Sequence, residues 1–440
     1  MWTFAKACVH ILMLMPMIGL VDGNNFYVSC ERIFNPKLEG RPVAVLSNND
    51  GCVISRSYEF KALNIPMGTP YFKLKPMLNV YGIAIKSSNY ELYGDISRRI
   101  ISVLQEHCHD VEQYSIDEAF VYMDLHKGYD VAEYEAFGRL LRSRVLNWVG
   151  IPCGVGFAKT KTLAKIANHI GKKLPSGVFV MPENPKSVLE NLPIDEVWGI
   201  GRRLSVRLQQ MGIRSAWQFA NLDRALIQKK FSITQVKTAD ELLGIPRFER
   251  ENPEEPSQSI SCSRSYGYPV EKIEEIRESV AHYIAQAAEK LRNEKLRAAG
   301  ASIYLQYYPE YGQYAQDGGY VSTVIAFASA TNATSIMLSS VLPAVDALFI
   351  KGRRYKKSGV LFYGLESEHI QQLELFRDEA AEAQKAREER LAHVVDSVNN
   401  QLGRNTLFYL SEGIERPWQM RREFLTPDYT TSWDDLPVVK

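Results

Sequence analysis

The sequence predicts a multidomain α+β protein whose first large domain has a ferredoxin-like β-α-β-β-α-β core. Three observations predict this fold class. The chain has 440 residues, which is enough for about two to four domains with a core each. Apolar residues between positions 89 and 158 follow helical and strand periods in turn. A second series of strands and helices follows residues 249–256, an acidic stretch with prolines that is typical of a linker.

The elements of the first domain come in the ferredoxin-like order. They are a strand at Met17–Asp22, a helix at Tyr90–His107, a hairpin at Val111–Leu125, a helix at Tyr134–Val149 and a strand at Pro152–Phe157. This order places the first and third strands side by side and antiparallel. An insertion at residues 27–88 predicts a small subdomain at the edge of the sheet. Its strands are expected at Pro42–Ser47 and Cys52–Ser55, and its helix at Tyr58–Leu63.

Downstream segments extend this core and add a second compact unit. Lys161–Lys173 is predicted to be a basic helix and Gly177–Met181 a strand that extends the sheet. In the second unit we expect strands at Ser259–Tyr266, Ala301–Tyr307, Tyr320–Phe327 and Ser358–Tyr363, and helices at Glu271–Lys295 and Ser335–Phe349. A charged helix is expected to end near Leu402, before an irregular end that carries Trp, Tyr and Pro.

Three carboxylates are expected to meet at one edge of the first sheet. Asp22 closes the first strand, while Asp117 and Glu118 open the third. Because these strands are neighbours, residues that are distant in the chain converge. Like charges at close range repel without a cation, and hard oxygen ligands suit Mg²⁺. The arrangement favours a two-metal site, and an ordinary polar hairpin turn with a strand cap is the alternative.

Cationic side chains that could bind phosphates occur in two places. No acidic residue occurs in residues 154–182, which hold the lysines Lys159, Lys161, Lys165, Lys172 and Lys173. Tyr58 and Lys61 lie one helical turn apart on the inserted subdomain and offer a hydroxyl and an ammonium group. A solvated basic face and ordinary surface residues of a helix are the alternatives.

A helix-hairpin-helix is predicted around the glycine turn at residues 197–203. Gly199 and Gly201 in this turn place backbone N–H groups at a helix N-terminus, which suits a DNA phosphate irrespective of sequence. Arg202 and Arg203 follow, and residues 198–222 contain no acidic side chain, which supports DNA binding. A helical hairpin that only packs against its neighbours is the alternative.

Composition and charge exclude several classes of protein. The formal net charge of +1 excludes a uniformly basic nucleic-acid wrapper, so that any polyanion site must be local. With 23% charged and 45% hydrophobic residues, the chain is not a disordered polymer. The six cysteines form no C-x-x-C pair, which favours reduced thiols in a cytoplasmic protein over a disulfide framework or a zinc site.

The N-terminal sequence imitates a signal peptide. Lys6 precedes an apolar run at Ala7–Val21, but this run contains Pro16 and lacks a small-x-small cleavage pattern. The run is also too short for a membrane span of about 20 residues. We expect residues 1–16 to be an appendage, Met17 to be the natural start, and the protein to make no membrane association.

Nine segments of the chain resemble one protein family. They are NNFYVSCE, VLSNNDGCVISR, SSNYELYGD, YSIDEAF, GVGFAKTKTLAKIANH, VWGIGRR, ISCSRSYG, AAEKLR and DYTT. These segments resemble the UmuC-type catalytic subunits of DNA polymerase V, in the Y family of translesion polymerases, from Met17 nearly to the C-terminus. The resemblance implies a right-hand polymerase with a ferredoxin-like palm at 17–26 and 89–185, small fingers at 27–88, a helix-hairpin-helix thumb at 186–248, a linker at 249–257, an α+β little finger at 258–366 and a tail at 367–440.

The resemblance also implies roles for individual residues. Asp22, Asp117 and Glu118 match the catalytic carboxylates that bind two Mg²⁺ ions. Tyr27 matches the steric-gate aromatic residue that excludes a ribose 2′-OH, and Phe26 lies in the same pocket. The residues that match those holding the triphosphate are Tyr58, Lys61 and Lys172. The residues that match the sliding-clamp motif Q-L-x-L-F are Gln372, Leu373, Leu375 and Phe376. Asn24-Asn25 departs from the family pattern, which has a small residue there, and the N-terminal extension has no counterpart.

These residues lead to the hypothesis of template-directed nucleotidyl transfer from a dNTP to a primer 3′-OH. The resemblance implies low fidelity and translesion synthesis in the SOS response to DNA damage. The implied partners are primer-template DNA, dNTP, a sliding clamp, a UmuD-type accessory dimer and RecA. One alternative is a nucleotide-cyclase-like palm enzyme, which would lack salt-sensitive binding to primer-template DNA. The other is a non-catalytic DNA-binding regulatory subunit, which would not extend a primer.

Overall fold

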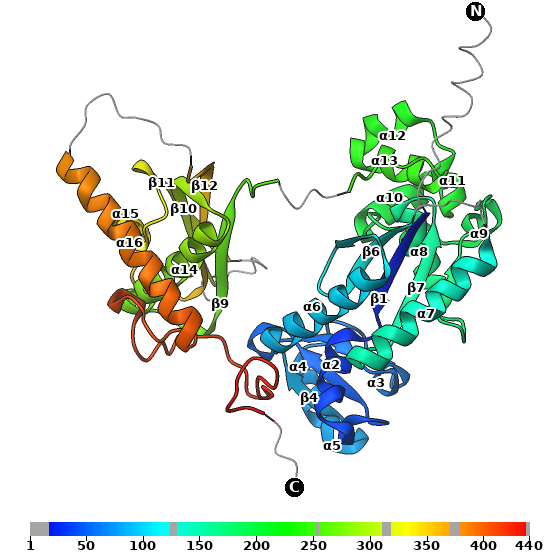
Figure 1. Ribbon diagram of the computed structural model, residues 1–440, viewed down its shortest axis with the longest axis horizontal. Helices are drawn as coiled ribbons and strands as arrows, with labels where there is room; N and C mark the ends of the chain where they lie inside the picture. Colours follow the sequence, from blue (N-terminus) through cyan, green and yellow to red (C-terminus); the bar gives the residue numbers. More distant parts are fainter. Residues whose placement is uncertain (1–16, 124–129, 251–254, 310–317, 370–378, 437–440) are drawn as a thin grey trace, which may run out of the picture. The chain divides into compact units, whose positions relative to one another are not determined.

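The protein is described by a computed structural model that covers residues 17–123, 130–250, 255–309, 318–369 and 379–436 (Figure 1). The chain divides into two compact units. Unit 1 comprises Met1–Ser47, Gly51–Glu251 and Phe424–Lys440, and unit 2 comprises Asn48–Asp50 and Asn252–Glu423. The expected appendage at residues 1–16 and the clamp motif at residues 372–376 lie outside the described residues.

Unit 1 is built on a five-stranded sheet with the strand order β5-β6-β1-β7-β8. The strands are β1 (Met17–Gly23), β5 (Asp110–Gln113), β6 (Glu118–Met123), β7 (Cys153–Ala158) and β8 (Val178–Val180). β1 pairs antiparallel with both β6 and β7, and β8 runs parallel to β7. With the helices α6 (Tyr90–His107) and α7 (Val131–Val149), these strands confirm the ferredoxin-like order and its expected extension by one strand.

Side chains of β1 alternate between two hydrophobic cores on opposite faces of the sheet. Met17 and Val21 belong to the core that α2 (Phe26–Phe34), α6 and α7 complete. Ile18 and Leu20 belong to the other core, which α8 (Lys161–Gly171) and the following helices complete. This division follows from the period of two along a strand. Asp22 is two residues after Leu20 and four after Ile18, so that its side chain belongs to the same face of β1. This face is the one that α8 covers.

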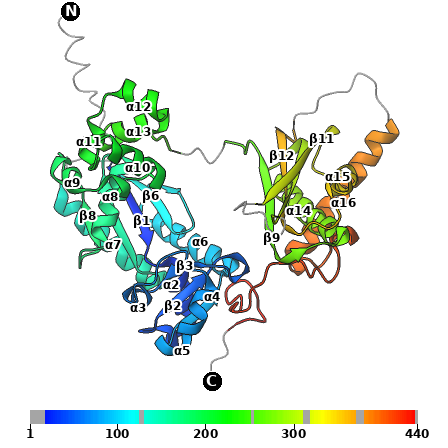
Figure 2. The same cartoon turned by 180° about the vertical axis from the view of Figure 1, so that it is seen from behind.

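The inserted subdomain contains a three-stranded sheet with the order β3-β2-β4 (Figure 2). β2 (Val43–Leu46), β3 (Val53–Arg56) and α3 (Tyr58–Ala62) confirm the expected strands and helix. β4 (Ala84–Ser87) runs parallel to β2 and was not predicted, because its four residues carry no alternating pattern. The short helices α4 (Tyr71–Leu74) and α5 (Leu78–Tyr81) complete the subdomain, whose core includes Leu46, Val53 and Phe60.

The segment after β8 is helical and carries the predicted glycine turn. Its helices are α9 (Lys186–Asn191), α10 (Arg202–Gln210), α11 (Ala216–Ala220), α12 (Arg224–Lys230) and α13 (Ile233–Leu242). Gly199 in the turn has φ +84°, a left-handed conformation that favours glycine. The turn lies between α9 and α10, as a helix-hairpin-helix requires.

Unit 2 contains a four-stranded antiparallel sheet with the order β11-β10-β12-β9. Its strands are β9 (Ile260–Val270), β10 (Leu296–Tyr307), β11 (Gly319–Thr331) and β12 (Tyr355–Ser367). The helices α14 (Ile273–Asn293) and α15 (Thr334–Leu348) share one core with the sheet, and α16 (Glu379–Leu402) contacts α15. The expected order of strands and helices is therefore confirmed, with longer strands than the sequence pattern predicted.

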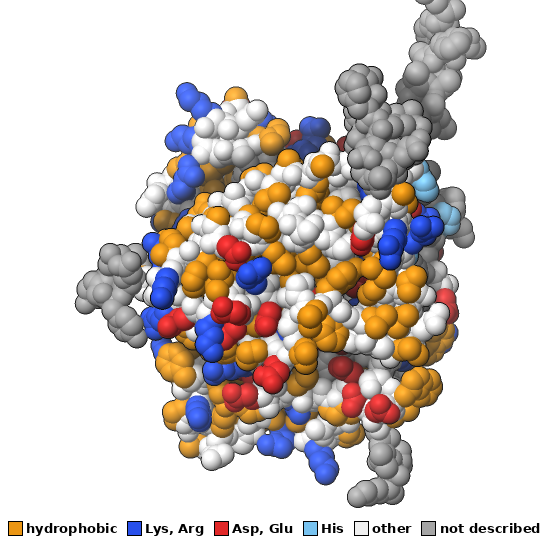
Figure 3. All heavy atoms as spheres, turned by 90° about the vertical axis from the view of Figure 1, so that its left-hand side faces the viewer, with side chains coloured by type: hydrophobic (Ala, Val, Ile, Leu, Met, Phe, Trp, Pro, Cys, Tyr) orange, Lys and Arg blue, Asp and Glu red, His pale blue; other side chains and the backbone are white. Residues whose placement is uncertain are grey.

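Three properties of the described residues concern surface charge, membrane crossing and the state of the thiols. Charges of both signs are interspersed on the face in Figure 3. No helix in the described ranges combines the length and apolar character that crossing a bilayer requires. The cysteines within these ranges are all free thiols: Cys30, Cys52, Cys108, Cys153 and Cys262.

Candidate active site

The backbone of the sheet brings the predicted carboxylate residues together. Asp22 of β1 lies directly opposite Glu118 of β6 in the antiparallel register. The amide of Gly23 donates a hydrogen bond to the carbonyl oxygen of Asp117 over 2.9 Å. The predicted convergence of the first and third strands is therefore confirmed at the level of the backbone.

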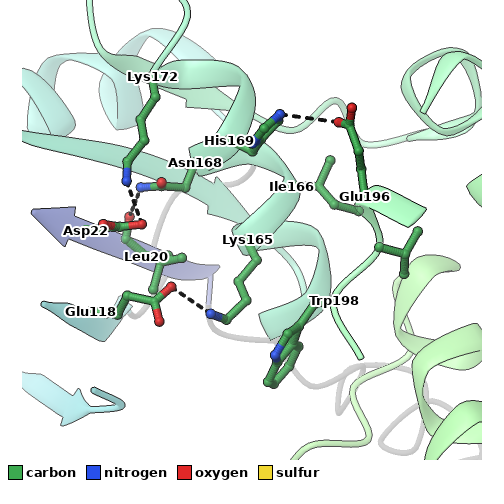
Figure 4. Close-up of a pocket in the computed structure, with 11 residues that line it drawn as sticks. Leu20, Asp22, Glu118, Lys165, Ile166, Asn168, His169, Lys172, Glu196 and Trp198 are labelled. Carbon is green, nitrogen blue, oxygen red and sulfur yellow. Dashed lines mark hydrogen bonds and ion pairs between the residues drawn. The ribbon is translucent and has the colours of Figure 1, made fainter. Parts of the chain in front are cut away.

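Lysine side chains from the α8 segment pair with two of these carboxylates (Figure 4). Nζ of Lys172 lies 2.6 Å from Oδ2 of Asp22, and Nζ of Lys165 lies 2.7 Å from Oε1 of Glu118. Among the residues that the structure describes, no three Asp, Glu, His or Cys side chains are grouped closely enough to hold a metal ion. The gathering of three carboxylates around a metal ion stays a prediction: Asp22 and Glu118 each pair with a lysine of the α8 segment, while Asp117 accepts a hydrogen bond from Ser115.

Asp22 has an unusual environment for a carboxylate. Its pKa is raised from 3.8 to about 6, chiefly by burial; Lys172 lowers it, and the charges of Glu118 and Asp117 contribute to the rise. A divalent cation would offset this burial and repulsion of like charges. The carboxylate oxygens of Asp22, Asp117 and Glu118 are the hard donors that Mg²⁺ prefers, and this ion usually takes one or two carboxylates together with substrate phosphates and waters. The donor chemistry of these residues therefore fits such an ion.

The raised pKa of Asp22 predicts how stability depends on pH. Between pH 4 and pH 6 the unfolded chain releases the proton that the folded chain retains, so that the free energy of unfolding falls as pH rises through 6. At about 1.4 kcal/mol per pKa unit, the penalty above pH 6 is about 3 kcal/mol. Without divalent cations at pH 7.5, Asp22→Asn is therefore expected to unfold at higher denaturant concentration than the unmodified protein.

Denaturant titrations at pH 4 and pH 7.5 check this expectation, since the difference between the two proteins should vanish at pH 4. Glu183→Gln is the control, because Glu183 is an exposed carboxylate whose partner is Lys159 at 3.0 Å. A lower stability of Asp22→Asn at pH 7.5 would contradict the assigned cost of ionising Asp22.

Two of the three carboxylates, Asp22 and Glu118, line a cavity of about 250 Å³ in unit 1 (Figure 4). Asp22 and Glu118 come from β1 and β6, while Lys165, Lys172 and His169 come from the α8 segment. Trp198 of the glycine turn also lines the cavity, and Nζ of Lys165 lies 5.1 Å from its ring centroid. Sequence reasoning missed Trp198 as a lining residue, although its position in the glycine turn was a usable signal.

Lys61 and Lys172, two of the predicted triphosphate residues, lie within electrostatic range of each other. Burial lowers the pKa of Lys61, and the charges of Arg56 and Lys172 lower it further while Asp22 raises it. Nζ of Lys61 also lies 5.1 Å from the ring centroid of Tyr58. Sequence reasoning missed Arg56 of β3, since nothing local indicates that its charge acts on Lys61. The cations gathered here are suited to a polyanionic ligand.

Not every lysine of residues 154–182 belongs to this cationic group. Lys161 is buried and its Nζ donates to Oε1 of Glu112 over 2.8 Å, so that it stabilises the fold. Lys159 pairs with the exposed Glu183. The expected single cationic stripe is therefore wrong, because the side chains of this segment point to different carboxylates.

Tyr27 lies at the start of α2, between the carboxylates and α6. Its ring stacks on the ring of Tyr93 with centroids 4.6 Å apart and meets the ring of Tyr90 edge-on at 6.1 Å. Burial raises the pKa of Tyr27 to about 12, and the charges of Tyr90 and Asp117 contribute. The charge of Asp117 raises the pKa of Tyr27 and also that of Asp22. Asp117 therefore lies within electrostatic range of both side chains. The neighbouring Phe26 is buried in the core that α2 completes.

The departure at Asn24-Asn25 has a structural consequence in this pocket. Asn25 has φ 50°, a left-handed conformation that asparagine tolerates better than most residues, and α2 begins directly after it. Nζ of Lys61 donates to Oδ1 of Asn25 over 2.6 Å. Asn25 therefore ties the inserted subdomain to the start of the helix that carries Tyr27.

The glycine turn before α10 presents an open surface. A Cβ atom at Gly201 would meet no heavy atom within 4 Å, and the side chains of Arg202 and Arg203 in the first turn of α10 are exposed. Arg207 differs, because it donates to the carbonyl of Lys230 over 2.8 Å. The predicted clamp residues, Gln372, Leu373, Leu375 and Phe376, lie outside the described residues.

Comparison with known proteins identifies the family. The chain is 40% identical over 431 residues to Protein UmuC of Salmonella typhimurium, which covers 96% of this chain and 100% of the relative. The chain belongs to the impB/mucB/samB family. Protein MucB of Escherichia coli is 38% identical over 427 residues and covers 96% of this UmuC-type chain. DNA polymerase IV of Bacillus velezensis is 27% identical over 298 residues, which span 65% of this chain and 69% of the relative.

Individual segments of this UmuC-type chain match separate family descriptions. Residues 21–169 match the impB/mucB/samB family, residues 182–213 the helix-hairpin-helix motif of the same family, and residues 257–375 its C-terminal domain. Residues 389–439 match a domain of unknown function. The helix-hairpin-helix predicted from the glycine turn is thereby confirmed.

Solved structures show the same fold. A Y-family DNA polymerase chimera built on Dbh is similar with a TM-score of 0.63 and 21% identity, covering 80% of this chain and 99% of that chain. An insertion ternary complex of Dbh DNA polymerase gives a TM-score of 0.54 at 21% identity, covering the same shares of both chains. The right-hand fold inferred for this UmuC-type chain is therefore that of Y-family polymerases.

Proposed function

We propose that this UmuC-type chain is a template-directed DNA polymerase that extends primers across damaged template positions. The primer 3′-OH attacks the α-phosphorus of a deoxynucleoside triphosphate, and pyrophosphate leaves. The observation that carries this proposal is the register of Asp22 opposite Glu118, with Lys165 and Lys172 paired to these two carboxylates. The chain that holds this site matches Protein UmuC over the full length of that relative.

The residues of the site have distinct roles in this reaction. Asp22, Asp117 and Glu118 would hold divalent cations, for which we propose two Mg²⁺ ions. Bound there, such ions lower the pKa of an attacking hydroxyl and neutralise the leaving phosphates. Lys61 and Lys172, with Arg56, would bind the triphosphate oxygens, whose negative charge is complementary to these neighbouring cations. Lys172, which pairs with Asp22, would then share its charge between that carboxylate and the phosphates. Tyr58, whose ring lies beside Nζ of Lys61, adds a hydroxyl to the same surface.

Sugar selection is assigned to Tyr27. Its ring is held by stacking on Tyr93, so that its position is defined and a ribose 2′-OH would overlap with it. Because its pKa is raised to about 12, the hydroxyl of Tyr27 is neutral at physiological pH, and the volume of the ring acts rather than a charge.

DNA binding is assigned to the glycine turn before α10. Backbone N–H groups at Gly199 and Gly201 are suited to a phosphate, and the exposed Arg202 and Arg203 add positive charge. This surface favours a DNA polymerase over a nucleotide-cyclase-like enzyme, which needs no such hairpin. We also propose that residues 372–376 bind a sliding clamp, and that a UmuD-type dimer and RecA assist the chain.

Primer extension with Mg²⁺ tests the polymerase function. A template with an abasic site downstream of the primer should be copied past the lesion, with added clamp, UmuD-type dimer and RecA increasing the yield. Binding to primer-template DNA should weaken steeply as salt rises from 50 to 200 mM. DNA binding without any extension under all these conditions would instead support a non-catalytic subunit.

A further inference from the structure

The segment Phe424–Tyr429 lies against the inserted subdomain and α6 within unit 1. The amide of Phe424 donates to Oγ of Ser87 over 2.9 Å, and the amide of Ser87 donates to the carbonyl of Phe424 over 3.1 Å. The ring of Tyr429 stacks on that of Phe34 with centroids 4.8 Å apart. This segment belongs to the region that matches a domain of unknown function.

Asn89 joins this segment to the first turn of α6. Its Oδ1 accepts a hydrogen bond from the amide of Leu92 over 3.1 Å and so caps the helix. Its Nδ2 donates to the carbonyl oxygens of Thr426 at 3.1 Å and Pro427 at 3.3 Å, and also lies 3.3 Å from Oγ1 of Thr426, which accepts from it. Asn89 is fully buried, so that these bonds are not exchanged with water.

A buried carboxylate connects the same segment to the sugar-selecting residue. Oε1 of Glu31 accepts one hydrogen bond from the hydroxyl of Tyr93 at 2.7 Å and another from the hydroxyl of Thr426 at 3.2 Å. Burial raises the pKa of Glu31, and these two bonds together with Lys86 lower it. The ring of Tyr93 stacks on that of Tyr27. A continuous set of contacts therefore runs from Thr426 through Glu31 and Tyr93 to Tyr27.

We infer that Thr426 is a positioning residue for sugar selection, acting through Glu31 and Tyr93 on the ring of Tyr27. The inference rests on the proposed role of Tyr27. Both donors bind Oε1 of Glu31, and its Oε2 is buried without a hydrogen-bond partner among the described residues. Loss of the Thr426 hydroxyl leaves Tyr93 as the remaining donor to this carboxyl group and adds to the cost of burying polar atoms without partners. Glu31 would then shift, and the Tyr93 ring, whose hydroxyl it holds, would shift with it. The ring of Tyr27 stacks on that of Tyr93 and excludes the 2′-OH by its volume, so that a small displacement of the Tyr27 ring is enough to admit this hydroxyl.

Thr426→Val tests this inference, because it removes the hydroxyl and retains the shape of the side chain. The measured quantity is the ratio of kcat/KM for dCTP to kcat/KM for rCTP opposite a template guanine, with the full-length protein. We expect this ratio to fall by about tenfold, as the loss of about one hydrogen bond to a charged group predicts. Thr426→Ser, which retains the hydroxyl, should restore the ratio.

The chain offers a matched control directly after this segment. Within the described part of the chain, Oγ1 of Thr430 is buried without a hydrogen-bond partner, so that Thr430→Val makes the same change and should leave the ratio unaltered. An unchanged ratio in Thr426→Val, or an equal loss of kcat/KM for both nucleotides, would overturn the inference. Should Thr426→Val fail to fold, Thr426→Ala removes the hydroxyl without adding a methyl group and is measured in its place.

Tyr27→Ala separates this inference from the proposed function. If Tyr27→Ala leaves the ratio unchanged, the role of Tyr27 fails and the inference fails with it. If Tyr27→Ala lowers the ratio and Thr426→Val does not, only the connection through Glu31 is refuted. In the double variant, Thr426→Val should cause no further fall, because its effect passes through the ring that is already absent.

Discussion

Asp117→Asn is expected to reduce nucleotide incorporation by about 10³-fold. Several kcal/mol of charge stabilisation by metal ions depend on the carboxylates that hold them, and about 4 kcal/mol corresponds to this factor. Asp117 is the sharpest choice of the three carboxylates, because its charge affects both Asp22 and Tyr27. The substitution should preserve the local structure, since Oδ1 of residue 117 accepts a hydrogen bond from Ser115 over 2.8 Å and an asparagine oxygen can do the same.

Single-turnover incorporation and DNA affinity measured on the same variant distinguish catalysis from binding. Affinity for primer-template DNA should remain nearly unchanged, because the proposed DNA-binding turn is distant in the sequence and does not use Asp117. Asp95→Asn is the control, since Asp95 pairs with Arg98 and Arg99 on α6 and has no role in the site. Incorporation at the unmodified rate by Asp117→Asn would refute the assignment of the carboxylates.

The register of the carboxylates could be predicted because it depends on topology alone. In a β-α-β-β-α-β sheet the first and third strands are antiparallel neighbours, so that the end of one meets the start of the other, as Asp22 meets Glu118. The ionic partners of these residues could not be predicted. Lys165 and Lys172 lie seven residues apart, about two helical turns, which indicates a common face of α8. Which strands that face meets is decided by tertiary packing.

The elements that sequence reasoning missed lack local signals. The helix α2 has no side-chain hydrogen bond at its N-cap, and the residue before it, Asn25, is left-handed. The burial of Lys161 contradicts what a run of lysines predicts, because its partner Glu112 comes from a distant strand. Likewise, nothing local indicates that Thr426 contacts Glu31, since this contact joins opposite ends of the chain. Long-range contacts thus determine the parts of the site that periodicity leaves open.

Tyr27→Ala is expected to lower discrimination against ribonucleotides by about 10²-fold, the range in which a pocket's shape separates closely related substrates. Removing the ring opens the space that a 2′-OH requires, whereas kcat/KM for deoxynucleotides should change much less. Steady-state incorporation of dCTP and rCTP opposite guanine measures the effect. Undiminished discrimination in Tyr27→Ala would remove this residue from sugar selection.

Tyr27→Phe identifies which part of the side chain is responsible. The phenylalanine ring can retain the stacking on Tyr93, where the tyrosine ring centroid lies 4.6 Å away and the planes are inclined by 14°. Because the hydroxyl of Tyr27 is neutral well above physiological pH, its loss removes no charge from the pocket. Tyr27→Phe should therefore discriminate as the unmodified protein does. If it instead resembles Tyr27→Ala, the hydroxyl rather than the ring volume excludes the ribose, and the contact with Tyr93 then serves to aim that hydroxyl.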